Sequence, residues 1–175
     1  MQYFTWKLMG EINSTDPDVV ARAQRTWDRN VAGYEKQLEL LLEHFSEHQQ
    51  RFWRDYAYHL HDGTVFQITL GDALETDVPV VLSRSPGSGV AIDVTDGTGA
   101  WLYELKYAGI EAIDARLRGA AGSFDGTLLE RWLYSELTGE GPVAYRHSIL
   151  FSTGSELSVV FKRFSHSRKK LARSR

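Results

Sequence analysis

The chain has 175 residues, of which 42% are hydrophobic and 25% are charged, and these are ordinary values for a globular protein of one domain. It contains no cysteine, and this excludes disulfide bonds, a thiolate nucleophile and cysteine-ligated zinc. No apolar stretch approaches the roughly 20 residues of a membrane-spanning helix, and the first residues lack the pattern of a secretory signal, so we expect a cytoplasmic protein without a membrane partner.

The net charge of −3 hides an uneven distribution along the chain. Residues 162–175 carry seven Lys or Arg and no acidic residue, which leaves 13 basic and 23 acidic residues in positions 1–161, a net charge of about −10. An acidic body repels nucleic-acid phosphates and attracts basic proteins. We therefore expect a basic protein partner for the body, and contact with nucleic acid only through the basic end.

The first part of the chain, residues 1–60, is predicted to be helical. Residues 15–17 (Thr-Asp-Pro) form a helix start, because a capping side chain precedes a proline at the first helical position. The pattern that follows predicts one helix over about 17–45, and residues 46–49 (Ser-Glu-His-Gln) match a capping box that opens a second, shorter helix. The apolar seam of the long helix consists of Trp27, Val31, Tyr34, Leu38, Leu41 and Phe45. This seam packs on the protein's own sheet or, as the alternative, on a second copy in a homodimer.

From residue 63 onward the sequence has the pattern of an antiparallel sheet. Short runs of alternating apolar and polar residues, or of apolar residues, are separated by turns rich in Gly, Asp and Ser. The final two runs enclose a four-residue turn and predict a closing hairpin. The runs predicted to be strands are 66–70, 78–82, 90–94, 101–107, 110–117, 128–137, 143–151 and 157–164.

These patterns together predict an α+β fold in which N-terminal helices pack on a meandering antiparallel β-sheet. The turns follow one another closely with no helical pattern between the strands, and this favours antiparallel pairing over βαβ units. We expect a single domain over residues 1–164, with a helical part at 1–60 and the sheet at 63–164. Residues 165–175 are predicted to form a basic, flexible tail.

Short motifs at both ends and in the middle of the chain resemble an uncharacterised bacterial family of unknown function. They are the opening M-Q-Y-F-T, the His61-Asp62 step, W-L-Y-S-E at 132–136 and H-S-I-L-F-S-T-G-S-E-L at 147–157. Members of this family typically begin M-K-Y-F-T and end H-x-I-L-F-S-x-G-x-E-[LI]. The closing hairpin is similar, more loosely, to immunity proteins that neutralise bacterial toxins. The resemblance implies no catalytic residue and gives no expectation for the basic end.

The stretch H-L-H-D at 59–62 is the candidate metal site of the sequence. In an extended segment His59 and His61 point to the same side, so both imidazoles can share one metal ion, with Asp62 or the distant His147 completing the ligand set. The alternative is a structural junction between the last helix and the first strand. In that interpretation Asp62 begins the turn, and the His61 ring bonds a backbone group that is exposed where the helix ends.

No motif identifies an activity, because the chain has neither a phosphate-binding loop nor a nucleophile elbow. Two hypotheses follow from the residues. The first is a non-enzymatic protein-binding module of the immunity or interaction type, which docks an acidic face of the sheet on a basic protein and uses no cofactor. The second is a metal-assisted hydrolase that uses His59, His61 and Asp62, with His147 as a further ligand.

Overall fold

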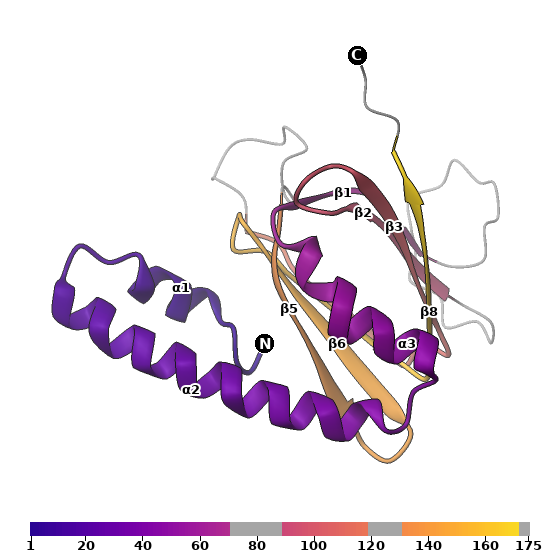
Figure 1. The fold of residues 1–175 in the computed structure, drawn as a ribbon, viewed down its shortest axis with the longest axis horizontal. Coiled ribbons are helices and arrows are strands. Elements are labelled where there is room, and N and C mark those ends of the chain that lie inside the picture. The colour runs from indigo at the N-terminus through magenta and orange to yellow at the C-terminus, as the bar shows by residue number, and fades with distance from the viewer. Residues whose placement is uncertain (71–88, 119–130, 172–175) are drawn as a thin grey trace.

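The computed structural model describes residues 1–70, 89–118 and 131–171, and it has the predicted α+β fold (Figure 1). The helical elements are α1 (Trp6–Ile12), α2 (Pro17–Leu42), α3 (Glu47–Arg51), a π-helical turn (Phe52–Tyr56) and a 3₁₀ turn (Ala57–Leu60). The strands of the described residues are β1 (Gly63–Leu70), β2 (Gly89–Thr95), β3 (Trp101–Ala108), β4 (Ala112–Arg116), β5 (Arg131–Glu140), β6 (Ala144–Phe151), β7 (Glu156–Phe161) and β8 (Arg163–Lys170). The strand predicted at 78–82 lies outside the described residues.

The long helix α2 begins where the sequence predicts. The Asp16 side chain accepts hydrogen bonds from two backbone N–H groups of the first turn, at 2.9 and 3.4 Å, and Pro17 occupies the first helical position. The helix ends at Leu42, before the predicted end, and the N–H of Phe45 bonds the Leu42 carbonyl at 3.0 Å in the turn that follows. In the described part of the chain, neither this helix nor another is long and apolar enough to cross a membrane.

The apolar seam of α2 packs against the N-terminal segment and the sheet of the same chain. The Trp27 ring lies 5.0 Å from the Phe4 ring and 4.9 Å from the Tyr134 ring of β5, measured between centroids. The Tyr34 hydroxyl accepts the backbone N–H of Leu137, also in β5, at 3.0 Å. Figure 1 shows α2 next to β5, the strand that these contacts join it to. The seam thus packs on the protein's own sheet, the first of the two predicted packings, although Trp27 and Tyr34 stay half-buried. The alternative of a homodimer through this seam stays a prediction.

A buried carboxylate of β5 fixes the first residues of the chain. Glu136 is 1% exposed, and its oxygens accept the N–H groups of Gln2 at 2.7 Å, Tyr3 at 2.6 Å and Phe4 at 2.6 Å. These charge-assisted hydrogen bonds compensate the cost of removing the carboxylate from water. The N-terminal segment therefore forms part of the packed structure beside α2.

The predicted capping box opens α3. The N–H and the hydroxyl of Ser46 both donate to Oε1 of Gln49, at 2.9 and 2.8 Å. Instead of one regular helix, the segment continues through the π-helical turn and the 3₁₀ turn as far as Leu60. The π-helical turn buries both Phe52 and Trp53 in the core.

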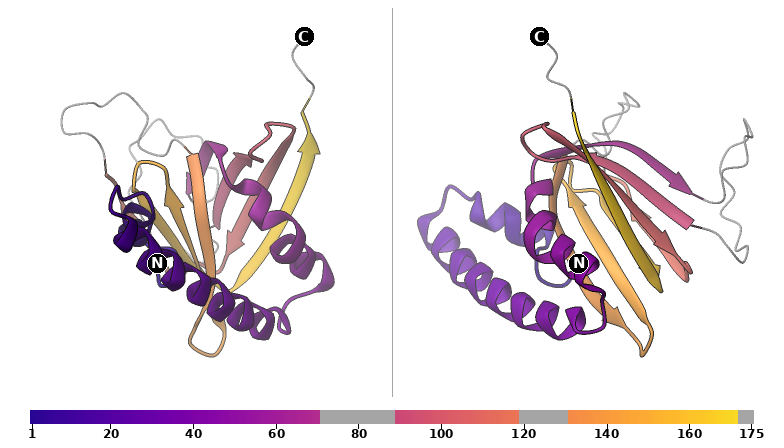
Figure 2. Two further views of the ribbon diagram at one scale, coloured as in Figure 1. Left: turned by 60° about the vertical axis from the view of Figure 1, so that its left-hand side comes forward. Right: turned by 45° about the vertical axis from the view of Figure 1, so that its right-hand side comes forward.

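The strands form one antiparallel sheet in the order β4-β7-β6-β5-β1-β2-β3-β8. Strand β1 belongs to both halves of this sheet: Gly63 and Thr64 pair with β5, whereas the residues from Val65 to Leu70 pair with β2. The pairing with β2 is irregular between Val65 and Gln67, and a bulge of this kind bends a strand. The two halves of the sheet are turned toward each other, as Figure 2 shows.

A long two-stranded ribbon connects the two halves at the other side. Strand β3 runs into β4 and β7 runs into β8, and the ladder pairs of the ribbon continue across the bend between them. The backbone of Lys162 donates to the Ala108 carbonyl at 3.1 Å, and Glu111 donates to the Val160 carbonyl at 2.9 Å. Gly109 turns the chain there with φ +67°, which glycine adopts without strain.

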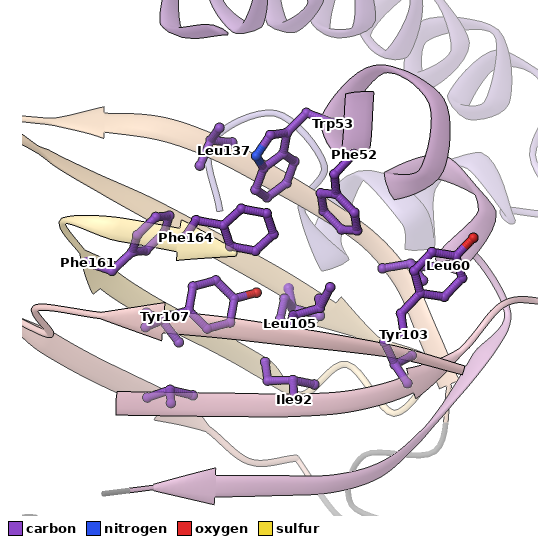
Figure 3. Close-up of a cluster of buried hydrophobic side chains, with 14 of the residues drawn as sticks. Phe52, Trp53, Leu60, Ile92, Tyr103, Leu105, Tyr107, Leu137, Phe161 and Phe164 are labelled. Carbon is purple, nitrogen blue, oxygen red and sulfur yellow. The ribbon is translucent and has the colours of Figure 1, made fainter. Parts of the chain in front are cut away.

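The main core fills the space between the two halves of the sheet and the helical turns at 52–60. Figure 3 shows Phe52 and Trp53 entering this space opposite side chains of β2, β3, β5 and the ribbon. Full burial of one such side chain stabilises the fold by about 1.5–3 kcal/mol. The largest fully buried side chains of this core are Trp132, Tyr103, Tyr107, Phe52, Phe151, Phe161, Leu42, Leu60, Ile92, Leu105, Leu137 and Ile149.

Residues 165–170 are part of the sheet, so the prediction of a flexible tail from residue 165 is wrong for this part. Strand β8 pairs with β3 along its whole length, from Arg163 opposite Ala108 to Lys170 opposite Trp101. The physical reason is an alternation of buried and exposed side chains, which is hard to see in a segment so rich in Lys and Arg. Phe164 and His166 are buried, whereas Ser165 and Ser167 are exposed, which is the period of a half-buried strand.

Candidate functional site

The H-L-H-D segment joins the last helical turn to β1, and main-chain hydrogen bonds fix it in place. The N–H of Asp62 donates to the Trp132 carbonyl of β5 at 2.8 Å. The His59 carbonyl accepts the N–H of Gly97, in the turn between β2 and β3, at 2.9 Å. Residues 59–62 therefore tie the helical part to both halves of the sheet.

The glycines at this junction are required by close packing. A Cβ atom on Gly63 would lie 2.0 Å from the Thr95 carbonyl oxygen, and one on Gly97 would lie 2.2 Å from the His61 carbonyl oxygen. Both distances are far shorter than any van der Waals contact. Asp62 itself has φ +62°, the left-handed conformation that Asp and Asn tolerate better than most residues. The backbone at this position is held by its surroundings on every side.

The predicted metal ligands are not assembled into a site. The His59 ring packs on Tyr58 at 4.0 Å, and both side chains are exposed. His61 Nδ1 lies 3.2 Å from a carboxylate oxygen of Asp62, so its partner is this side chain instead of the predicted backbone group. His147 lies elsewhere, in the core. Among the described residues, no three His, Asp or Glu side chains form a group that could hold a metal ion.

His147 is enclosed by aromatic side chains of the core. Its Nδ1 atom lies 2.7 Å from the Tyr107 hydroxyl, and its ring meets Trp53 at 4.9 Å with an interplanar angle of 88°. The edge-to-face geometry suits a weak N–H···π contact between these two rings. Burial lowers the pKa of His147 to about 3, because the core does not solvate an imidazolium. His147 is thus neutral and structural.

The end of β8 carries an arranged group of side chains that the tail prediction missed. The guanidinium carbon of Arg168 lies 4.1 Å from the centre of the Tyr56 ring and 4.5 Å from the centre of the Trp101 ring. Stacking on aromatic rings is a common contact of arginine and restricts its side chain. Hydrogen bonding to the Tyr103 hydroxyl is the largest cause that raises the pKa of Arg168. The alternation Phe164, His166, Arg168 was the signal in the sequence.

The helical side of the same strand end contains a second pair of stacked rings. His48 and His166 lie parallel, with ring centres 4.2 Å apart and an interplanar angle of 7°. His48 Nε2 also lies 3.3 Å from the His166 carbonyl oxygen. Burial, together with the nearby His48 and Arg168, lowers the pKa of His166 to about 4. We infer that this stack serves to attach α3 to β8.

Several acidic side chains on the described part of the sheet pair with basic ones, and three exposed glutamates follow one another toward the end of α2. On the sheet, Lys106 pairs with Glu104 at 2.9 Å, and Arg146 pairs with Glu140 at 2.9 Å. The predicted acidic face of the sheet therefore carries paired charges. We use the name acidic end of α2 for the exposed residues Glu35, Glu39 and Glu43, together with the exposed Leu40.

No protein-family model matches this chain, and no curated protein matches it. The resemblance to an uncharacterised bacterial family and to immunity proteins stays a prediction from short motifs. Function is therefore inferred from the two arranged surfaces, the acidic end of α2 and the end of β8.

Proposed function

We propose that this chain is a non-enzymatic protein-binding module of the immunity or interaction type, which binds a basic protein partner through the acidic end of α2. The observation that carries the proposal is an arrangement of charge that opposes the stability of the helix bearing it. Charges that work against folding are expected where a surface serves binding.

The acidic end of α2 is unfavourable for the helix in two ways. Glu35, Glu39 and Glu43 follow one another at intervals of four, and each such pair of like charges destabilises a helix by about 0.2–0.5 kcal/mol. They also approach the C-terminus, where the helix dipole favours cations, yet the last turn of α2 contains no basic residue. Arg54 offsets the charge of Glu39, because its Nη2 lies 2.6 Å from a carboxylate oxygen of Glu39.

An apolar residue in this acidic group supports a protein partner. Leu40 is 59% exposed on the outward side of α2, next to Glu39 and three residues before Glu43. An apolar contact ringed by charges is the usual plan of a protein interface, with the charges at the rim. A nuclease toxin, whose active site must attract phosphate, is one class of basic protein that would fit.

The first experiment tests the free protein. We expect the double substitution Glu35→Gln and Glu43→Gln to raise the free energy of unfolding by about 0.5–1 kcal/mol, because both like-charge pairs are removed. The measurement is urea unfolding at low ionic strength. The matched control is Glu11→Gln, since Glu11 pairs with Lys7 at i,i+4 and should not stabilise the protein when replaced. A loss of stability in the double variant would assign these charges to folding.

The second experiment tests the partner. The full chain is immobilised, a basic protein captured from an extract of the source cells is identified and purified, and its association rate is measured between 50 and 500 mM NaCl. With Glu35, Glu39 and Glu43 all changed to Gln, we expect the rate at 50 mM NaCl to fall about tenfold or more. The matched control changes Arg22, Arg25 and Arg29 of the same helix to Gln and should not slow association. A rate indifferent to salt and to the glutamates, or failure to capture a basic protein, overturns the proposal.

A further inference from the structure

Among the strands of the described residues, β8 is the last in the sheet, and the described helical part covers its outer edge only in part. The Gln49 side chain donates to the Phe164 carbonyl, and His48 Nε2 lies 3.3 Å from the His166 carbonyl. These contacts show that the main-chain groups of even-numbered residues in β8 point away from β3. On the opposite side, the N–H of Leu171 bonds the Ala100 carbonyl of the β2–β3 turn at 2.8 Å, as expected for an odd-numbered position.

The same alternation continues beyond the covered part of the edge. It directs the main-chain N–H and C=O groups of Arg168 and Lys170 to the free side of β8. Both residues are exposed, and α3 with its caps reaches the strand earlier, at Phe164 and His166. Two consecutive edge positions thus offer the pattern that an added strand pairs with.

Side chains at these two positions add a specific charge. Arg168 is stacked against Tyr56 and Trp101, so the planar guanidinium is pre-organised and its edge can donate two parallel hydrogen bonds. Lys170 is the ladder partner of Trp101 and follows on the same side of the strand as Arg168. The planar guanidinium of Arg168 and the ammonium group of Lys170 together match two carboxylates spaced two residues apart on an extended peptide.

The charge of this edge selects among the possible occupants. A second copy pairing through β8 would bring Arg168, Lys169 and Lys170 close to the same residues of its partner, which like-charge repulsion disfavours. Nucleic acid would meet a chain with a net charge of −3. The exposed Arg168 and the half-buried Tyr56 and Trp101 are of the residue types that dominate protein–protein contacts.

We propose that the free edge of β8 at Arg168 and Lys170 binds an extended acidic segment of a partner protein, whose carboxylate is held by the stacked Arg168. This surface is distinct from the acidic end of α2, and its ligand has the opposite charge. The proposal does not depend on the function proposed above.

The experiment uses an eight-residue peptide of alternating Glu and Val as the probe, titrated into the full chain and followed by calorimetry and by Trp fluorescence. We expect Arg168→Gln to weaken binding about tenfold or more, as for loss of a charge-assisted bidentate contact. Arg168→Lys keeps the charge but loses the fork, and it should weaken binding nearly as much. The matched control, Lys169→Gln, makes the same change of charge on the opposite side of the strand and should alter affinity less than about twofold.

Each other outcome contradicts the proposal in a defined way. Equal losses for Arg168→Gln and Lys169→Gln would show general charge attraction without a site. Tighter binding of a single-stranded oligothymidylate of equal charge would identify a nucleic-acid surface. Absence of peptide binding at millimolar concentration would leave the basic edge as protection against strand pairing. If Arg168→Gln proves unfolded in the far-UV spectrum, Lys170→Gln replaces it, with a weakening of about threefold or more expected.

Discussion

The junction at residues 59–63 and the end of β8 flank the same turn between β2 and β3, yet they are built in opposite ways. At the junction the main chain is fixed by hydrogen bonds to Trp132 and Gly97, while the side chains of His59 and His61 face solvent. At the end of β8 the side chain of Arg168 packs against two rings, while no strand of the described residues pairs with the outer main-chain edge. A conspicuous polar motif therefore serves the fold, whereas a stretch that reads as a solvated tail carries the organised side chains.

The largest effect is expected from a side chain added to the junction. Gly63→Ala would place its Cβ 2.0 Å from the Thr95 carbonyl oxygen, so the junction must shift, at a cost of about 3 kcal/mol or more in the free energy of unfolding. Urea unfolding measures this. Gly10→Ala in α1 is the matched control, since apart from its own helix backbone and chain neighbours no atom of the described residues lies within 4 Å of the added Cβ, and it should be neutral or stabilising. Equal effects in both variants would show that the junction is not tightly packed.

The next effect concerns His147, a histidine of the core. The folded-state pKa of His147 is about 3, below its ordinary value of 6.5, so the unfolded chain binds a proton that the folded chain does not. The stability due to neutral His147 is complete above about pH 6.5 and falls by about 1.4 kcal/mol per pH unit as the pH drops toward 3. His166 acts in the same direction.

We therefore expect His147→Gln to reduce the acid sensitivity of the unfolding free energy by about 1.4 kcal/mol per pH unit between pH 5.5 and 4.5. Urea unfolding at these two pH values and at pH 7 measures the slope. The control is Gly10→Ala, which changes no ionisable group and should leave the slope unchanged. An unchanged slope in the His147 variant would contradict its assignment as a neutral core residue.

A smaller effect on stability is expected at the end of β8. Arg168→Gln removes two cation–π contacts at an exposed position, which together contribute about 1 kcal/mol. Thermal unfolding, with Lys169→Gln as the control, measures this difference. A cost above about 3 kcal/mol would mean that the stack supports the fold as the junction does, and the contrast between the two regions would disappear.

The smallest effect is expected from the side chains of the motif itself. The double substitution His59→Gln and His61→Gln keeps the main-chain hydrogen bonds of the junction and should change the free energy of unfolding by less than about 0.5 kcal/mol. Added zinc should not raise the melting temperature of the unsubstituted chain. A clear rise with zinc that disappears in the double variant would restore the metal hypothesis.

Local signals in the sequence were sufficient for most of the elements. Asp16 and Pro17 mark the start of α2, Ser46 and Gln49 mark the start of α3, and the alternating runs mark the strands, because caps and side-chain periods are properties of neighbouring residues. The π-helical turn at 52–56 was not predictable, since it depends on where Phe52 and Trp53 meet the core.

Contacts between distant positions explain what the sequence could not predict at the candidate sites. In the sequence His147 is a possible metal ligand like the other histidines. In the structure it belongs to β6, an interior strand of the sheet, and its side chain is buried. The side chain of Arg168 stacks on Tyr56 and Trp101. These three residues belong to three separate elements, which are β8, the π-helical turn and β3. Only the alternation from Phe164 to Arg168 was visible locally, and five basic residues in 162–170 concealed it.

The buried Glu136 has a consequence for the order in which the chain can fold during synthesis. Residues 2–4 are synthesised before Glu136, and the carboxylate that binds their N–H groups is translated more than 130 positions after them. The α1–α2 segment must therefore wait, with its apolar seam uncovered, until β5 is available. Contacts of such long sequence separation slow folding, so nascent chains of this protein are expected to need a chaperone that shelters the seam.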